Sequence, residues 1–588
     1  MFQNLTSKKL TTHLLIFVLF FLNIRFRGQD CRNNLLYAKD GHIVYIAAAL
    51  AIAVDPKSGK QRYMSAHTDD IISIAMSHVH AKKRGAYSIV ATGEVGRSPK
   101  IIVWESHSMC VINTMKGAHQ RGVTQLAFSP DGQTLASIGL DDQVSFFFYT
   151  KMWGLFFFFF GSFFRLLLLL LLLLFVFNSF CLISNMIIYL IFVFIFLYIY
   201  YPWIVIYLFS LHQNSLALHD WRSGVVLVRV RTGGEKVFGL QFQPGPESNP
   251  TADDRLVTCG AKHMTFWKRS GKSQISSRGA RFGRDLAGNM SIVDICFDGI
   301  GRTIAATSLG HLGVWPPKDQ NTAMLPLGKG SIKNAHKGPI NSVETVPGGD
   351  KIVSGGVDGT IKVWICPTNV DRKVELFKTY DSFNKLTRIS SVQSLSVSSN
   401  KARALIGTRG GDIIEIKLGD GSLLKNKALT NGHNHGELWG LAAHPHDPTI
   451  FCTSGDDKTV RMWSIRKREC IGMTQSDALP DMSRAIAFTP RKGDFLAVGL
   501  GGRLAGRKIG NHGKSAGKLL MLDCKDLKVV STFKVAKEMI SDICFTPDGQ
   551  TLAVASHDNI IYLLSYRSPT DLQPRARCRG HSSYITNM

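Results

Sequence analysis

The stretch KIVSGGVDGTIKVW, residues Lys351–Trp364, decides how this chain folds, because it contains two short strands and the turn that joins them. Apolar residues alternate with small or polar ones on both sides of the turn, as they do in half-buried strands. Asp358 and Gly359 supply the capping side chain and the backbone freedom that a tight hairpin needs. The stretch therefore predicts a pair of antiparallel strands that closes on a tryptophan.

The same pattern recurs along the chain. Strands that close on tryptophan end at Trp104, Trp267, Trp315, Trp364 and Trp463. Weaker copies without the tryptophan end at Val54, His219, Ile416, Leu522 and Leu564. Most successive copies are 45 to 52 residues apart. Several short strands in a period of this length, each bounded by turn residues, are typical of the four-stranded blades of a WD-repeat β-propeller.

Counting the copies gives the domain organisation. Seven strand ends from Val54 to Ile416 are enough for one closed ring, and three more follow. The sequence thus predicts an all-β fold of tandem WD-repeat β-propellers, with a first, seven-bladed propeller in residues 26–425. Residues 426–588 are expected to form a truncated second propeller, because three blades leave a strand edge open.

The polar residues of the repeat are interpreted as structural. Asp358 and Asp457 each stand six residues before a tryptophan, and His336 and His433 open their repeats. These side chains and the tryptophans are expected to hold the blades together. The sequence shows no pattern of nucleophile, base and orienting acid, and its eleven cysteines are scattered singly, without zinc spacing. We therefore expect reduced thiols, no metal, no cofactor and no enzymatic activity.

One interval of the repeat is anomalous. Trp104 and His219 are 115 residues apart, and residues 144–213 between them are rich in Phe and Leu. Without this segment the interval is regular, so it is interpreted as an insertion at the hairpin between the last two strands of one blade. It could supply one or two membrane spans. A retained intron is favoured, because intron borders can encode Val-Ser and Gln, and a thymine-rich tract encodes Phe and Leu.

The first 25 residues present a similar choice. They have the charged start and apolar centre of a signal peptide, but no small-residue cleavage site follows. A mispredicted start is favoured over secretion.

The charge of the chain indicates acidic partners. The formal net charge is +26 and the isoelectric point is about 9.7, which favours attraction to acidic surfaces. The ending Gly513-Lys514-Ser515 resembles a phosphate loop, but Lys508 stands where such a loop needs its first glycine. The basic residues around it are instead candidate contacts for an acidic protein tail. The candidates are Arg503, Arg507, Lys508, Lys514 and Lys518, together with Arg466, Lys467 and Arg468.

The N-terminal stretch FRGQDCRNNLLYAKDGHIVYIAA, Phe26–Ala48, resembles the echinoderm microtubule-associated protein-like family. The similarity continues in ATGEVGRSPKIIVWES and in GELWGLAAHP, and the segment Arg27–Asn34 is its most specific part. This resemblance implies two tandem propellers that bind tubulin without catalysing a reaction. The expected partners are then tubulin and microtubules, with other proteins at the propeller faces, and the expected location is the cytoplasm and its microtubule cytoskeleton.

Two other functions compete with this hypothesis. If residues 144–213 are a genuine anchor, the chain would be a membrane-tethered WD-repeat adaptor. An RNA-associated propeller would also suit the basic charge, but no aromatic and basic strand signature of a single-strand binder is present, so no nucleic acid is expected.

Overall fold

The computed structural model describes most of the chain from residue 26 to residue 588. The described ranges are 26–77, 88–144, 210–244, 255–271, 274–280, 282, 290–316, 324–325, 331–368, 372–387, 389–433, 437–467, 469–475, 479–502 and 515–588. Within them the secondary structure is all β, apart from the 3-10 helix η3, Ser382–Leu386. The predicted leader, residues 1–25, lies outside the described residues.

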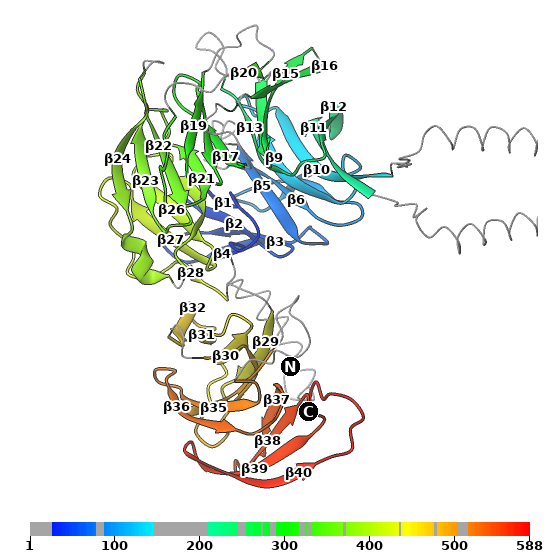
Figure 1. The fold of residues 1–588 in the computed structure, drawn as a ribbon, viewed down its shortest axis with the longest axis vertical. Helices are drawn as coiled ribbons and strands as arrows, with labels where there is room; N and C mark the ends of the chain where they lie inside the picture. Colours follow the sequence, from blue (N-terminus) through cyan, green and yellow to red (C-terminus); the bar gives the residue numbers. More distant parts are fainter. Residues whose placement is uncertain are drawn as a thin grey trace, which may run out of the picture. The chain divides into compact units, whose positions relative to one another are not determined.

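Seven sheets follow one another along the chain and surround a common axis, and they form the first propeller (Figure 1). Sheet 1 contains β1 Leu35–Tyr37, β2 Ile43–Ala47, β3 Leu50–Val54 and β4 Gln61–Met64. Sheet 2 contains β5 Ile71–Ser77, β6 Ile89–Glu94, β7 Ile101–Glu105 and β8 Val111–Met115. Sheet 3 contains β9 Gly122–Phe128, β10 Thr134–Val144, β11 Ser210–Asp220 and β12 Val225–Gly233.

The remaining sheets of the ring have three to five strands. Sheet 4 contains β13 Val237–Phe242, β14 Arg255–Gly260, β15 His263–Ser270, β16 Gln274–Ala280 and β20 Met324–Leu325. Sheet 5 contains β17 Ile292–Phe297, β18 Thr303–Thr307 and β19 Leu312–Trp315. Sheet 6 contains β21 Ile340–Thr345, β22 Lys351–Gly356, β23 Ile361–Ile365 and β24 Glu375–Tyr380. Sheet 7 contains β25 Val392–Val397, β26 Arg403–Thr408, β27 Asp412–Lys417 and β28 Thr430–Asn431, which lies beyond the predicted boundary at residue 425.

Three further sheets of four strands each make up the second propeller region. Sheet 8 contains β29 Leu438–Ala443, β30 Ile450–Gly455, β31 Val460–Ser464 and β32 Glu469–Met473. Sheet 9 contains β33 Ser483–Phe488, β34 Phe495–Leu500, β35 Lys518–Asp523 and β36 Val529–Lys534. Sheet 10 contains β37 Ile540–Phe545, β38 Thr551–Ser556, β39 Ile561–Ser568 and β40 Asp571–Cys578. The predicted all-β fold of tandem propellers is confirmed.

The hydrophobic insertion enters the ring in sheet 3. Its strand order is β12-β11-β10-β9, so the chain leaves the sheet after β10 and returns at β11. The predicted position between the last two strands of a blade is therefore wrong, because the insertion joins the second and third strands. The sequence repeat showed only three strands per period, and it did not show that a fourth strand, β12, follows. Residues 145–209 lie outside the described residues.

The first strand of each sheet lies innermost, and successive innermost strands contact one another around the ring. In sheets 5, 6 and 7 this strand has a β-bulge after its first residues, at Ile292/Asp294, Ile340/Ser342 and Val392/Ser394. The residue after each bulge accepts a backbone N–H from the next innermost strand: Asp294 Oδ2 from Val343 at 2.8 Å, and Ser342 Oγ from Leu395 at 3.2 Å. Neighbouring sheets are thereby held in register.

The ring closes between sheet 7 and sheet 1 by repeating the same contact. The Asn34 N–H donates to Ser394 Oγ at 3.4 Å, and the Tyr37 N–H donates to Ser396 Oγ at 3.1 Å. A hydrophobic cluster covers the same seam. It contains Phe26, Leu35, Tyr37, Ile43, Tyr45, Ala47, Ile52, Leu405 and Ile413, all buried. Sheet 1 and sheet 7 are each built from consecutive strands, so no strand is exchanged between the two ends of the ring. The N-terminal stretch therefore closes the ring through these hydrogen bonds and its buried apolar side chains.

Candidate functional site

The N-terminal segment Arg27–Asn34 reaches across the seam of the ring. The Arg27 guanidinium donates to Asp30 at 2.8 and 2.9 Å, to Asp70 at 2.9 Å and to the Ile71 carbonyl of sheet 2 at 3.3 Å. The Asn34 side chain donates to the Arg27 carbonyl at 2.7 Å and accepts from Ser394 Oγ of sheet 7 at 2.9 Å. One short segment thus connects sheet 2 with sheet 7.

Gly28 explains why this segment requires a glycine. A Cβ at this position would lie 2.0 Å from the Thr408 carbonyl oxygen, and backbone atoms cannot move away easily. The glycine therefore allows the segment to pass directly over the end of β26.

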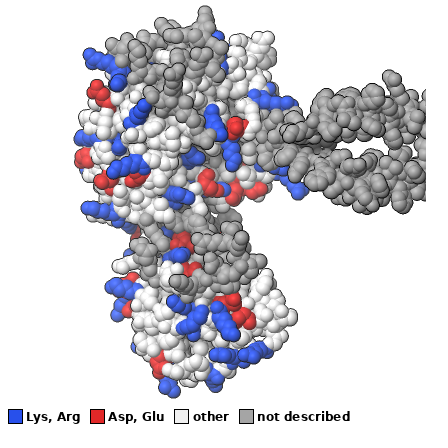
Figure 2. Space-filling model, viewed as in Figure 1, with Lys and Arg blue, Asp and Glu red and all other residues white. Residues whose placement is uncertain are grey.

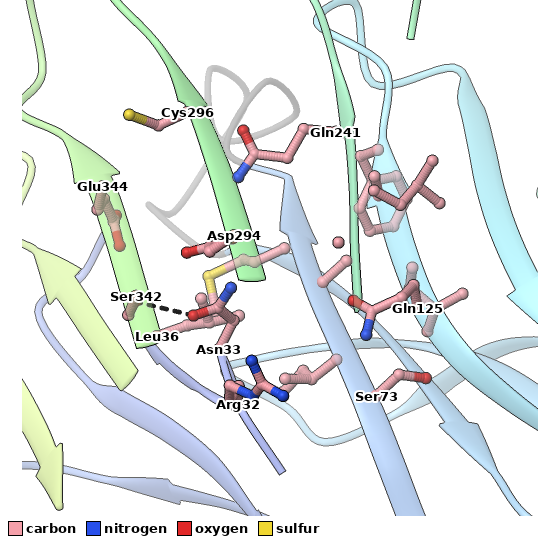
Figure 3. Close-up of a pocket in the computed structure, with 18 of the residues that line it drawn as sticks. Arg32, Asn33, Leu36, Ser73, Gln125, Gln241, Asp294, Cys296, Ser342 and Glu344 are labelled. Atoms are coloured by element: carbon pink, nitrogen blue, oxygen red, sulfur yellow. Dashed lines mark hydrogen bonds between the residues drawn. The ribbon is translucent and has the colours of Figure 1, made fainter. Parts of the chain in front are cut away.

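The segment continues into a cavity enclosed by the innermost strands (Figure 3). The cavity has a volume of about 370 Å³, and its lining comes from β1, β5, β9, β13, β17, β21 and β25 and from the residues just before β1. Asn33, in the left-handed region at φ 51°, accepts a hydrogen bond from Ser342 Oγ at 2.9 Å. Arg32 extends beside it at the same end of the cavity, with its guanidinium 5.1 Å from the Phe238 ring centroid.

Two acidic residues also line this cavity, Asp294 of β17 and Glu344 of β21. Burial raises the pKa of Asp294 to about 7, against hydrogen bonds from Val343 and Ile295 that favour the ionised form. Burial likewise raises the pKa of Glu344 to about 8, and the nearby Asp294 adds to the shift. Both carboxyl groups therefore hold a proton more strongly than they would in water.

The residues predicted to hold the blades lie together in sheet 6. Ser354 Oγ accepts a hydrogen bond from Trp364 Nε1 at 2.8 Å and lies 2.8 Å from His336 Nε2. His336 Nδ1 lies 3.1 Å from Asp358, which also accepts from the backbone N–H groups of Lys337 and Thr360. Desolvation opposes ionisation of Asp358, but the bonds from His336 and the turn prevail and lower its pKa.

Sheet 8 contains the equivalent group. Thr453 Oγ1 accepts from Trp463 Nε1 at 2.7 Å and lies 2.8 Å from His433 Nε2, while His433 Nδ1 lies 3.0 Å from Asp457. Desolvation acts to raise the pKa of Asp457 as well. The hydrogen bond with His433 outweighs this effect, so the pKa of Asp457 is lowered.

The other three tryptophans are buried in the third strands of sheets 2, 4 and 5. Trp104 Nε1 donates to Thr92 at 3.2 Å and Trp267 Nε1 donates to Thr258 at 2.9 Å. Trp315 Nε1 has no hydrogen-bond partner among the described residues.

In sheet 3, which carries the insertion, the hydrogen-bonded side chains differ from those of sheets 6 and 8. Ser137 Oγ lies 2.8 Å from Nε2 of His119 and 2.8 Å from Nε2 of His219, so a second histidine stands where sheets 6 and 8 have tryptophan. His219 Nδ1 is buried and has no hydrogen-bond partner within the described ranges. Burial lowers the pKa of His219 to about 3.

The predicted basic contacts are only partly described. Arg466 and Lys467 are exposed in the turn between β31 and β32. Lys518, at the start of β35, is partly buried and donates to Ser515 Oγ at 3.4 Å. Arg468, Arg503, Arg507, Lys508 and Lys514 lie outside the described residues. On the face in Figure 2, lysines and arginines are spread among fewer acidic residues.

Sequence reasoning missed the cavity residues Arg32, Asp294 and Glu344. A weak signal was present, because Asp294 and Glu344 are the single acidic residues of two innermost strands, IVDICF and INSVET. The strand pattern alone does not indicate that these two side chains and Arg32 surround one space.

Other chemistry is limited in the part of the chain that the structure describes. The cysteines there form no disulfide, and no three His, Cys, Asp or Glu side chains are grouped to hold a metal ion. Among the same residues, no helix has the length and apolar character to cross a membrane.

Comparison with known proteins identifies both propeller regions. A model of the HELP motif matches residues 26–52, and a model of the echinoderm microtubule-associated protein second β-propeller matches residues 438–588. The WD domain, G-beta repeat, matches residues 110–147 and 329–364.

Similar proteins match almost the whole chain. Echinoderm microtubule-associated protein-like 2 from Homo sapiens is 24% identical over 96% of this chain and 69% of its own length. The 77 kDa echinoderm microtubule-associated protein from Lytechinus variegatus is 23% identical over 96% of this chain and 68% of its own length. A solved structure, the β-propeller domain of Cps50 (Swd1) from Myceliophteria thermophila, covers 64% of this chain and 93% of its own, with 16% identity and a TM-score of 0.39. The motif at the ring seam, the matched second propeller and the similarity over 96% of the chain together support an echinoderm microtubule-associated protein-like family of WD-repeat proteins.

Proposed function

We propose that this protein is a non-enzymatic, microtubule-associated scaffold that binds tubulin through its propeller faces and basic loops. The observation that carries the proposal is the pairing of the HELP motif, residues 26–52, with the second-propeller match, residues 438–588, in a chain whose relatives are named as microtubule-associated proteins. The cytoplasm and its microtubule cytoskeleton are the location that follows.

Charge supplies the physical basis of this proposal. The net charge of +26 favours an acidic filament, and long-range attraction of this kind increases the rate of encounter. Arg466 and Lys467 are exposed side by side in one turn, so both can approach an acidic partner. Such binding should weaken as salt screens charges beyond a Debye length of about 8 Å.

Co-sedimentation of the full chain with polymerised tubulin, across a salt series, tests the proposal. We expect the protein to pellet at low salt and to be released progressively as salt rises. Absence from the pellet at the lowest salt concentration would contradict microtubule association.

A charge-reversed variant tests the role of the β31–β32 turn. Arg466→Glu combined with Lys467→Glu should reduce pelleting at every salt concentration. The matched control is Lys57→Glu with Lys60→Glu, which makes the same charge change in the equivalent turn between β3 and β4. Equal losses in both variants would show that the attraction is diffuse, and would contradict a specific contact at the β31–β32 turn.

A further inference from the structure

The cavity of the first propeller contains a guanidinium group that makes no direct ion pair within the described residues, although its charge interacts at longer range with Asp294 of the same cavity. Within the described residues, the Arg32 side chain makes no hydrogen bond and no ion pair, and its guanidinium lies over the Phe238 ring at 5.1 Å. Arginine presents a planar fork of donors that matches the oxygens of a carboxylate or phosphate group. Burial lowers the pKa of Arg32, so a bound anion would relieve a desolvated charge.

Two amides reach the same space from the opposite side (Figure 3). Gln125 of β9 and Gln241 of β13 line the cavity, and neither side chain has a hydrogen-bond partner in the described parts of the chain. Each amide can donate two hydrogen bonds to a ligand. Arg32, Gln125 and Gln241 therefore supply unused donors from three different elements around one volume.

The two carboxyl groups of the cavity are more than a means of holding adjacent sheets together. Ser342 occupies the position equivalent to Asp294 and makes the same bond to the next strand, so a hydroxyl is sufficient there. Among the described residues, Glu344 accepts a single long hydrogen bond of 3.5 Å, from the Val397 N–H. When protonated, each carboxyl group has an O–H that can donate to a ligand oxygen.

We propose that the cavity of the first propeller is a binding site for a small oxyanion, a carboxylate or phosphate compound, held by Arg32, Gln125 and Gln241. The volume of about 370 Å³ lies within the range of small-ligand pockets. Its titratable lining consists of Arg32, Asp294, Cys296 and Glu344. Protonated Asp294 and Glu344 donate to the same ligand, so binding is accompanied by proton uptake at neutral pH.

Isothermal titration calorimetry of the full chain tests this site, with sodium phosphate and sodium succinate as probes at constant ionic strength. We expect one site per chain for at least one probe, and the probe that binds identifies the phosphate or carboxylate source. Lack of a heat of binding with both probes would overturn the proposal.

Two variants locate the binding. Arg32→Gln removes the charge, and Gln241→Glu adds a like charge without touching the N-terminal segment that closes the ring. Each should weaken binding by about tenfold or more. Gln573→Glu, on the exposed part of β40, makes the same charge change away from the cavity and should have no effect. If Gln241→Glu binds as tightly as the unaltered chain, the anion lies elsewhere and the proposal fails.

The pH dependence separates a ligand site from a purely structural role. Affinity should fall as pH rises from about 6.5 to 8.5, because ionised Asp294 and Glu344 repel the anion. Asp294→Ser with Glu344→Ser retains hydroxyls at both positions and should flatten this profile. The profile is measured with succinate, because inorganic phosphate itself gains negative charge over this range, and an affinity for succinate that rises with pH would overturn the proposal.

Discussion

The first strand of the first propeller and the first strand of the second propeller region lie in different environments. In β1, Leu35 and Tyr37 are 0% and 5% exposed, because sheet 7 packs over them. In β29, Leu438 and Trp439 are 36% and 47% exposed, and Arg484 lies over the Trp439 ring at 4.0 Å. The same type of strand is therefore a core element where a neighbouring sheet covers it and a surface element where none of the described sheets does.

The difference shows that β1 and the N-terminal segment before it close the first ring at its seam. Inside both regions adjacent sheets pack in the same way, with β5 on β9 in the ring and β29 on β33 in the second region. At the seam, β1 packs on β25 in this way, and Asn34 and Tyr37 add side-chain hydrogen bonds with Ser394 and Glu415 of sheet 7. Four sets of substitutions test whether the seam and the second propeller region differ in this way.

The largest difference in the free energy of unfolding is expected between Leu35→Ala and Leu438→Ala. Removing a fully buried leucine leaves a cavity at the seam, which should cost about 3 kcal/mol of the free energy of unfolding. Leu438→Ala should cost less than about 1 kcal/mol, because its side chain is already partly in water. Urea denaturation of the full chain measures both. Similar losses would mean that β1 is no better packed than β29.

Gly28→Ala should have the next largest effect. The added methyl group would meet the Thr408 carbonyl oxygen, so the N-terminal segment must move, at a cost of about 2 kcal/mol. Gly419→Ala is the control, because a Cβ there has no atom within 4 Å. A Gly28→Ala chain that unfolds at the urea concentration of the control would show that the seam tolerates displacement.

Tyr37→Phe should cost about 1.5 kcal/mol. It removes the buried bond of 2.6 Å from Tyr37 Oη to Glu415, which joins sheet 1 to sheet 7, and leaves the carboxylate short of a donor. Burial, followed by this bond to Glu415, raises the pKa of Tyr37, so the phenol stays protonated. Tyr562→Phe is the matched change inside sheet 10, where the bond to Asp558 is partly buried, and its urea midpoint should shift less.

Mild acid should produce the smallest effect, located in sheet 3. Burial lowers the pKa of His219 to about 3 in the folded chain, so the unfolded chain binds more protons below the ordinary histidine pKa of about 6.5. The stability that neutral His219 contributes is fully present above about pH 6.5. As pH falls below this value the free energy of unfolding decreases, by about 1 kcal/mol at about pH 5.5.

His219→Asn tests this assignment by removing the titrating group while it keeps a polar contact for Ser137. Its stability should vary less with pH than that of the unaltered chain between about pH 7 and pH 5. His581→Asn, at an exposed histidine that makes no ion pair among the described residues, is the control and should leave the profile unchanged. An unaltered slope in His219→Asn would assign the acid sensitivity to another histidine.

The repeat itself was predictable from sequence. Trp104, Trp267, Trp315, Trp364 and Trp463 all lie in the third strands of their sheets, as the local strand and turn pattern predicted. The position of the insertion was predicted one hairpin too late, because the fourth strands vary in sequence and leave no clear signal. The weak repeat at His219 gave no sign that a second histidine shares Ser137 with His119.

Sequence alone determined what depends on neighbours along the chain: alternating strands, tight Asp-Gly turns, the number of blades and the family motif. The closure of the ring and the lining of its central cavity became visible in the tertiary structure alone. Asn34 and Ser394 bond although they lie 360 positions apart, and Arg32, Asp294 and Glu344 share one cavity although they come from three separate sheets or their approaches. Closing a ring brings its first and last strands together, and no local pattern specifies which side chains then face each other.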